Sequence, residues 1–315
     1  MATPQEGIVR PPAARPNSRT VILKVRPPAR NRRKVAKIAA TIPTLAARIG
    51  KIDPKARLTA TVAFGTSFWN AISTKGKPRR LRNFPKTQGA AKLLAPSTGG
   101  DVMIHIISRR PDLNFELANT IRTEMGDAVR VLDDVTGFEY LDSRDMTGHI
   151  DGTENPGTAA ERRDVALIGE EDPAFAGGSY VFHQRYVHDL AKWSRLSDKS
   201  QERAIGRTKK KSIELSEKKM PPTSHVSRVV MEDAQGEELE IVRVSFPYGG
   251  VDEKGLVFVA FTRDLRIPLK MLQRMMGVAG DGKHDRLMEF TQAVTGATFF
   301  APSLPMLKSL GRKTR

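Results

Sequence analysis

The sequence predicts an α+β protein made of two tandem ferredoxin-like domains, each an antiparallel sheet covered by helices. Two observations lead to this prediction. The hydrophobic pattern of the first half reads strand, helix, strand, strand, helix, strand, which is the order of the ferredoxin-like motif, and a similar pattern begins again in the second half. The length of 315 residues also leaves room for two domains of ordinary size, and 39% hydrophobic residues supply a core for each.

The first domain is predicted over residues 19–145, after a Pro-rich arm over residues 1–18. Its first strand covers 20–26, where Val21, Leu23 and Val25 would lie on one face. The other elements expected in this half are a helix over 32–50, a strand over 58–65, a basic loop over 73–100, a strand over 101–108, a helix over 111–126 and a strand over 128–140.

The pair Arg32-Arg33, followed by a weakly apolar stretch, also resembles a twin-arginine export signal. Lys37 interrupts that stretch, and Ile38 and Ile42 begin a spacing of three and four residues that is typical of an amphipathic helix. We therefore expect a folded helix here and a cytoplasmic protein.

The second domain is predicted over residues 146–304, and a short basic tail over 305–315 follows it. The elements expected here are a strand over 179–188, a helical region that Asp189 caps, strands over 226–231, 238–246 and 256–262, a helix over 268–277 and a short last strand over 297–300.

Composition excludes several kinds of chemistry. The chain has no cysteine, so it forms no disulfide, thiolate metal site, iron–sulfur cluster or cysteine nucleophile. No apolar run reaches the roughly 20 residues that a membrane-spanning helix needs. The 52 Lys and Arg exceed the 35 Asp and Glu by 17, which favours anionic partners such as nucleic acid, acidic lipid or sulfonated and carboxylated small molecules.

The segment GHIDGTENP over 148–156 is the most unusual in the chain, because small residues around a carboxylate let the backbone approach a ligand closely. Alone, it also fits a capped turn between domains. The segments AFAGGSYVFHQRYVHDLAKW, IGRTK, PTSHVSRVV and IVRVSFPYG follow it in this order. Together, from about Gly7 to Ser303, they closely resemble the short-chain bacterial dye-decolourising peroxidases, whose Gly-x-x-Asp-Gly signature matches Gly148, Asp151 and Gly152.

This resemblance implies a haem peroxidase that uses hydrogen peroxide to oxidise dyes and phenolic or other one-electron donors through a ferryl intermediate. It implies one haem b per chain, held mainly by the C-terminal half, with His225 as the axial ligand of the iron. His188 is the alternative ligand. Asp285 is expected to accept the second N–H of the imidazole, and Glu289 is the alternative to it.

Three residues are expected on the peroxide side of the haem. The resemblance implies that Asp151 takes a proton from peroxide and returns it to the departing oxygen, while Arg243 stabilises the negative charge that develops. Ser245 lies two residues after Arg243, so on a strand it would face the same side. Its side chain would bond to a water or to peroxide, where some relatives have Asn.

Other residues are expected beside the cofactor. Arg207 is the expected partner of a haem propionate, and Gly152, Thr153, Glu154 and His149 are expected to contact the haem. His149 occupies a position where the family resemblance leads us to expect a bulky apolar residue. It would either change the charge of the pocket below pH 6 or face the haem edge.

Large dyes do not fit a pocket sized for peroxide, so bulky donors are expected to be oxidised at the surface. Trp193 or Tyr186 would relay the electrons.

Two alternative functions stay open: a protein that stores haem or releases its iron, and a basic nucleic-acid-binding protein. The basic stretches 30–37, 75–82 and 208–219 lack the interleaved aromatic residues of a single-strand platform.

The resemblance also implies a homo-oligomer. Relatives that are packaged in protein nanocompartments carry a C-terminal tail, and the short basic segment LPMLKSLGRKTR gives no support for such packaging here.

Overall fold

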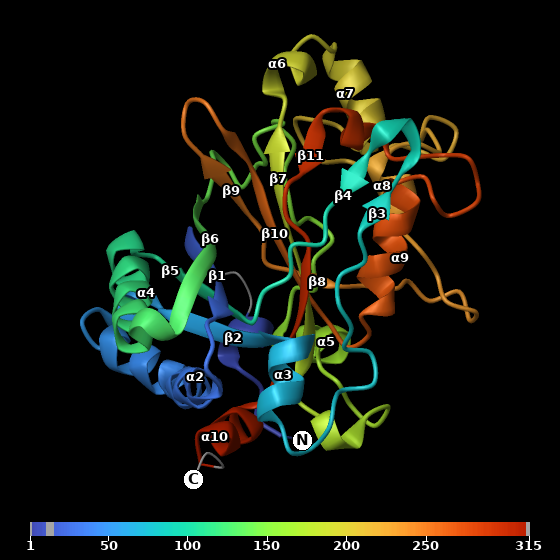
Figure 1. Ribbon diagram of the computed structural model, residues 1–315. Coiled ribbons are helices and arrows are strands. Elements are labelled where there is room, and N and C mark those ends of the chain that lie inside the picture. The colour runs from blue at the N-terminus through green and yellow to red at the C-terminus, as the bar shows by residue number, and fades with distance from the viewer. Residues whose placement is uncertain (1, 11–15, 313–315) are drawn as a thin grey trace.

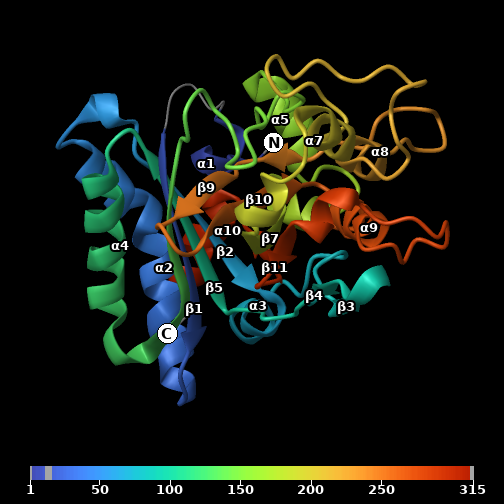
Figure 2. The ribbon, with the colours of Figure 1, turned by 90° about the horizontal axis from the view of Figure 1, so that it is seen from above.

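The computed structural model describes residues 2–10 and 16–312. Figures 1 and 2 show strands at the centre of the molecule, with the helices α2 (Ala29–Gly50) and α4 (Pro111–Met125) on one side and α8 (His225–Val229) and α9 (Arg266–Met275) on the other. The chain therefore combines helices and mainly antiparallel strands, as an α+β protein does.

The first half has four long strands in the order β2-β5-β1-β6. They are β1 (Asn17–Val25), β2 (Thr59–Gly65), β5 (Val102–Ser108) and β6 (Val129–Phe138), and α3 (Thr66–Ile72) follows β2 directly. The long loop after α3 carries a small pairing of β3 (Thr87–Gln88) with β4 (Leu94–Ala95). The helix α2 buries Val35, Ile42 and Ile49 on one face, so the segment after Arg32-Arg33 is a folded amphipathic helix.

The second half repeats this relative strand order as β12-β7-β10-β9. Its strands are β7 (Ser179–His188), β8 (Val242–Arg243), β9 (Phe246–Gly249), β10 (Lys254–Thr262), β11 (Thr291–Ala293) and β12 (Ala297–Ala301). Its further helices are α5 (Ala159–Ala166), α6 (Leu190–Trp193), α7 (Asp198–Ile205) and α10 (Leu304–Arg312).

The strands of the two halves join into one sheet, which the sequence pattern did not predict. β12 pairs with β2 at one seam, and Gly137 of β6 pairs with Tyr248 of β9 at the other, so the pairings form a closed circuit. Alternate side chains face the inside and the outside of this circuit. Ile22 belongs to the inner apolar cluster, whereas its neighbours Val21 and Leu23 pack beneath the helices.

The prediction of a strand over 226–231 was wrong. Residues His225–Val229 form the short helix α8, because Ser224 caps its first turn by accepting the Ser227 N–H at 3.2 Å. A short apolar run does not by itself distinguish a strand from a buried helical turn. The strand expected over 238–246 is also much shorter, since only Val242–Arg243 and the residues from Phe246 onward pair with β10.

Both ends of the described chain pack on the core. Helix α1 (Glu6–Val9) buries Ile8 completely, and the amide of Gln5 bonds to the main chain of Val62 and Pro302. At the other end α10 packs on α2 and buries Leu307. Parts of the predicted arm and tail are therefore ordered elements. Among residues 2–10 and 16–312, no helix has the length and apolar character needed to cross a membrane.

Candidate active site

A cavity of about 320 Å³ lies in the second half of the chain. Its volume falls in the range of roughly 300–1,000 Å³ that is typical of small-molecule and cofactor sites. Much of its lining is apolar and consists of Phe182, Val226, Val229, Leu256, Phe258, Met271, Leu272, Met275, Leu287 and Met288. The ionisable groups on its lining, apart from histidine and tyrosine, are Asp145, Asp151, Glu154, Arg207, Glu214, Glu238, Glu240 and Arg243.

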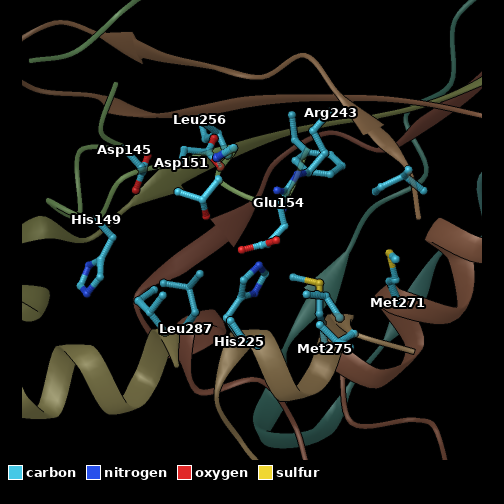
Figure 3. A pocket seen from close by; sticks show the side chains of 18 of the residues that line it. Asp145, His149, Asp151, Glu154, His225, Arg243, Leu256, Met271, Met275 and Leu287 are labelled. Carbon is cyan, nitrogen blue, oxygen red and sulfur yellow. Dashed lines mark hydrogen bonds between the residues drawn. The ribbon is translucent and has the colours of Figure 1, made fainter. Parts of the chain in front are cut away.

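His225 is the first residue of α8 and points into this cavity (Figure 3). Its Nδ1 lies 2.6 Å from Oδ2 of Asp285, a carboxylate with no exposed surface. The Leu287 N–H donates to the other oxygen of Asp285 at 2.9 Å. Because the carboxylate accepts from Nδ1–H, the lone pair of His225 Nε2 is left for the cavity. Glu289, the alternative partner, bonds to His284 instead.

His188 also lines the cavity, but both of its ring nitrogens are engaged. Nδ1 lies 2.7 Å from Thr291 Oγ1, and Nε2 lies 3.2 Å from Asp145 Oδ1. Burial is the largest single influence on Asp145 and opposes its ionisation, yet the bonds from His188 and Thr147 outweigh it and lower the pKa of Asp145 to about 2. No motif in the sequence indicated this pair, and its geometry argues against His188 as a metal ligand.

Asp151 and Arg243 lie across the cavity from His225 (Figure 3). Asp151 stands in a tight turn whose glycines, Gly148 and Gly152, have φ angles of +87° and +76°. These angles lie in the left-handed region that glycine adopts without strain. The Gly152 N–H donates to Asp151 Oδ1 at 2.7 Å, so one carboxylate oxygen is held by the backbone and the other stays available.

Asn155 connects the Asp151 segment to Arg243, and the sequence reasoning did not single it out. Its Oδ1 accepts the Arg243 N–H at 2.9 Å, and its Nδ2 donates to the Arg243 carbonyl at 2.7 Å. Its place in the GHIDGTENP segment was the only signal in the sequence.

Arg207 lines the cavity within a cluster of carboxylates. Its Nη2 donates to Glu154 at 2.6 Å and to Glu214 at 2.7 Å, and its Nη1 donates to the Ser212 carbonyl. Burial and the charges of nearby carboxylates raise the pKa of Glu238. The cavity lining thus carries more acidic than basic side chains, although the whole chain has a net charge of +17.

Gly152, Thr153 and Glu154 line the cavity as expected neighbours of a cofactor, and Thr153 Oγ1 lies 3.5 Å from the Ser212 hydroxyl. His149 is 5% exposed and stacks edge-on against Trp193 with 6.0 Å between ring centroids. Burial, followed by the positive charge of Lys209, lowers the pKa of His149 to about 4.

The two aromatic residues expected at the surface are both buried. Trp193 is 3% exposed, donates its Nε1–H to the Thr147 carbonyl at 2.8 Å and is absent from the cavity lining. Tyr186 lines the cavity and donates its hydroxyl to Gln184 at 2.7 Å. Burial raises the pKa of Tyr186, so its phenol stays protonated. Neither ring is therefore exposed on the outer surface, where a bulky donor would bind.

The structure does not bring Ser245 to the cavity. Strand β8 ends at Arg243, so the alternation that would give Ser245 and Arg243 a common face is interrupted. The Ser245 hydroxyl instead accepts the Val259 N–H at 3.3 Å.

Comparison with known proteins extends over nearly the whole chain. The profile of the Dyp-type peroxidase N-terminal domain matches residues 30–139, and that of the C-terminal domain matches residues 142–306. A "Dye-decolorizing peroxidase" from Mycolicibacterium paratuberculosis is 41% identical over 261 residues, which are 82% of this chain and 73% of the relative.

Two solved structures have the same fold at substantial identity. A DypB variant from Rhodococcus jostii RHA1 in complex with heme superposes with a TM-score of 0.93 at 38% identity and covers 98% of both chains. A dye-decolorizing protein from V. cholerae superposes with a TM-score of 0.89 at 43% identity and covers 97% of this chain and 99% of its own. With profile matches to both halves and identities of about 40% along most of its length, the chain belongs to the Dyp-type peroxidase family.

Proposed function

We propose that this chain is a haem-dependent peroxidase that uses hydrogen peroxide to oxidise dyes and other one-electron donors. One observation carries the proposal: a cavity in which His225, held by the buried carboxylate of Asp285, faces Asp151 and Arg243 on the opposite side. This arrangement separates a metal-binding nitrogen from an acid–base group and a cation, as peroxide cleavage requires.

The residues present fit a haem. His225 offers a neutral imidazole nitrogen, the usual axial donor, and its second N–H is already bonded to Asp285. The apolar lining that includes Val229, Leu256 and Met275 suits the flat faces of a porphyrin. A related DypB variant is in complex with heme. We infer that one haem b binds each chain, mainly through the C-terminal half.

When bound, the haem supplies the redox chemistry. The protein supplies a proton acceptor and a fixed positive charge. The free oxygen of Asp151 takes the proton of peroxide and returns it to the departing oxygen, while the Gly152 N–H keeps the carboxylate oriented. The guanidinium of Arg243 stabilises the negative charge that develops as the oxygen–oxygen bond breaks.

The remaining residues are assigned supporting roles. Gly152, Thr153, Glu154 and His149 border the cofactor. Arg207 gives up its bond to one of its two carboxylate partners, Glu154 or Glu214, and binds a haem propionate instead.

We also propose that residues 19–145 and 146–304 are the two domains, that each is a variant of the ferredoxin-like unit, and that the protein is a cytoplasmic homo-oligomer.

A spectrum and a turnover assay test this function. The purified protein supplied with haem is expected to show a Soret band and to bleach a dye only when peroxide is added. His225→Ala is expected to abolish specific haem binding, whereas His284→Ala, a control outside the cavity lining, is expected to keep it. A wild-type protein that binds haem but turns over no dye would instead indicate a haem-handling protein, and one that binds no haem would contradict the assignment.

A further inference from the structure

The side chain of Asn155 binds both main-chain polar groups of Arg243. It accepts the N–H at 2.9 Å and donates to the C=O at 2.7 Å, although the two residues are 88 positions apart in the chain. Two reciprocal bonds to one residue fix both the position and the direction of its backbone. Among the described residues, no other side chain forms a hydrogen bond with the main chain of Arg243.

The geometry of β8 explains why Arg243 needs this partner. Arg243 stands opposite Ala260 of β10, and the next residue, Val244, donates its N–H to the Val259 carbonyl at 2.8 Å. Successive residues of a strand direct their main-chain groups to opposite sides. The N–H and C=O of Arg243 therefore face away from β10. On that side the described part of the chain forms no further strand next to β8, and the side-chain amide of Asn155 binds both groups instead.

Asn155 is also part of the turn that carries Asp151. Its own N–H donates to the Gly152 carbonyl at 3.3 Å, and the Asp151 N–H donates to the Ser143 carbonyl at 3.0 Å. The main chain around Asp151 is thus held on both sides of the carboxylate. Among the residues that the structure describes, the side-chain hydrogen bonds between this turn and β8 are the two that Asn155 makes.

We propose that Asn155 is a positioning residue that sets the separation and mutual orientation of Asp151 and Arg243. This inference rests on the proposed function, in which these two side chains act together on peroxide. An amide is required because it offers one acceptor and one donor at this length, whereas an ionised aspartate has no donor and glutamine is longer by one methylene. A displacement of about 1 Å between reacting groups can reduce a rate about 100-fold.

The first test uses the haem-free protein and amide hydrogen exchange measured by NMR. In Asn155→Ala, exchange of the Arg243 N–H is expected to rise about tenfold or more, because its side-chain acceptor is removed. Asn155→Asp keeps an acceptor for this N–H and loses only the donor to the Arg243 carbonyl, so its exchange is expected to rise less. The Val244 N–H, which bonds to Val259, is expected to change less than twofold and serves as the internal reference. Equal changes at both amides, or none at Arg243, would overturn the inference.

The second test uses the haem-loaded protein and the rate constant for its reaction with peroxide. Both Asn155 variants are expected to lose about 10- to 100-fold in this rate constant while haem affinity stays within about twofold. Asn31→Ala is the matched control, because Asn31 also bonds to main-chain carbonyls, those of Arg26 and Pro27, and does not line the cavity. It is expected to react at the wild-type rate.

A double variant shows whether Asn155 acts through Arg243. In an Arg243→Leu background, Asn155→Ala is expected to reduce the peroxide rate less than threefold further, since the group that it positions is already absent. Fully additive losses would contradict a positioning role. A wild-type holoprotein that is inert to peroxide would refute the proposed function, whereas an active wild type with equally active Asn155 variants would refute only this inference.

Discussion

The Nδ1–H of His225 donates to a carboxylate oxygen of Asp285 at 2.6 Å, and Asp285 has no exposed surface. A buried carboxylate is stable only when its oxygens are hydrogen-bonded, and here the Leu287 N–H occupies the second oxygen. The pair therefore selects one tautomer of the imidazole and orients its other nitrogen toward the cavity.

Asp285→Asn is expected to reduce peroxidase activity or haem affinity about 10- to 100-fold, the usual effect of removing the partner of a metal-bound histidine. The amide keeps the size of the side chain but loses its negative charge, so the imidazole becomes a weaker donor. Haem titration and steady-state dye bleaching measure both quantities. Glu289→Gln is the matched control, since Glu289 bonds to His284, and an equal loss in that variant would contradict the role of Asp285.

His149→Phe is expected to make the protein more stable in acid. Burial and Lys209 lower the pKa of His149 to about 4, below its value of about 6.5 in an unfolded chain. The neutral ring is thus favoured in the folded state, so its contribution to stability is complete above pH 6.5 and is lost as the pH falls toward 4.

At pH 5 the wild type is expected to have lost about 2 kcal/mol relative to pH 8 through this histidine, a loss that the phenylalanine avoids. Urea unfolding at the two pH values measures the difference. A variant whose stability changes with pH as much as that of the wild type would show that folding does not lower the pKa of His149.

Trp193→Phe is expected to lower stability by about 1–2 kcal/mol, because the Thr147 carbonyl loses the indole N–H and the smaller ring leaves space beside His149 and Phe290. Thermal unfolding measures this loss. Since Trp193 is buried and does not line the cavity, turnover of small phenols and of bulky dyes is expected to change by the same factor. A loss of turnover with bulky dyes alone would instead indicate that Trp193 carries electrons from these donors.

Salt is expected to affect anionic and cationic dyes differently. The net charge of +17 attracts a sulfonated dye at long range, and raising the ionic strength to 1 M shortens the screening length from about 10 Å at 0.1 M to about 3 Å. The KM of the sulfonated dye is therefore expected to rise with salt. A cationic dye of similar size is expected to show no such rise, and parallel curves for the two dyes would exclude electrostatic steering.

The sequence predicted much of the fold because its local patterns are strong. The alternation in β1 and β2 and the spacing of three and four residues in α2 each depend on neighbours along the chain. The sequence pattern predicted a strand where the structure has α8, because the valines of this segment favour a strand. The cap of Ser224 on the first turn favours a helix instead. It also missed the two seams that join the halves, because the pairing of β12 with β2 involves segments far apart in sequence.

By itself the sequence determined the α+β class, the resemblance to one peroxidase family and the short set of histidines and carboxylates from which a site is built. Only the tertiary structure showed that Asp285, and not Glu289, is the hydrogen-bond partner of His225. It also showed that both ring nitrogens of His188 are hydrogen-bonded and that Asn155 binds the main chain of Arg243. The physical reason is that a hydrogen bond depends on distance and direction to within tenths of an ångström. Those quantities arise from the packing of distant segments, which residue order along the chain does not specify.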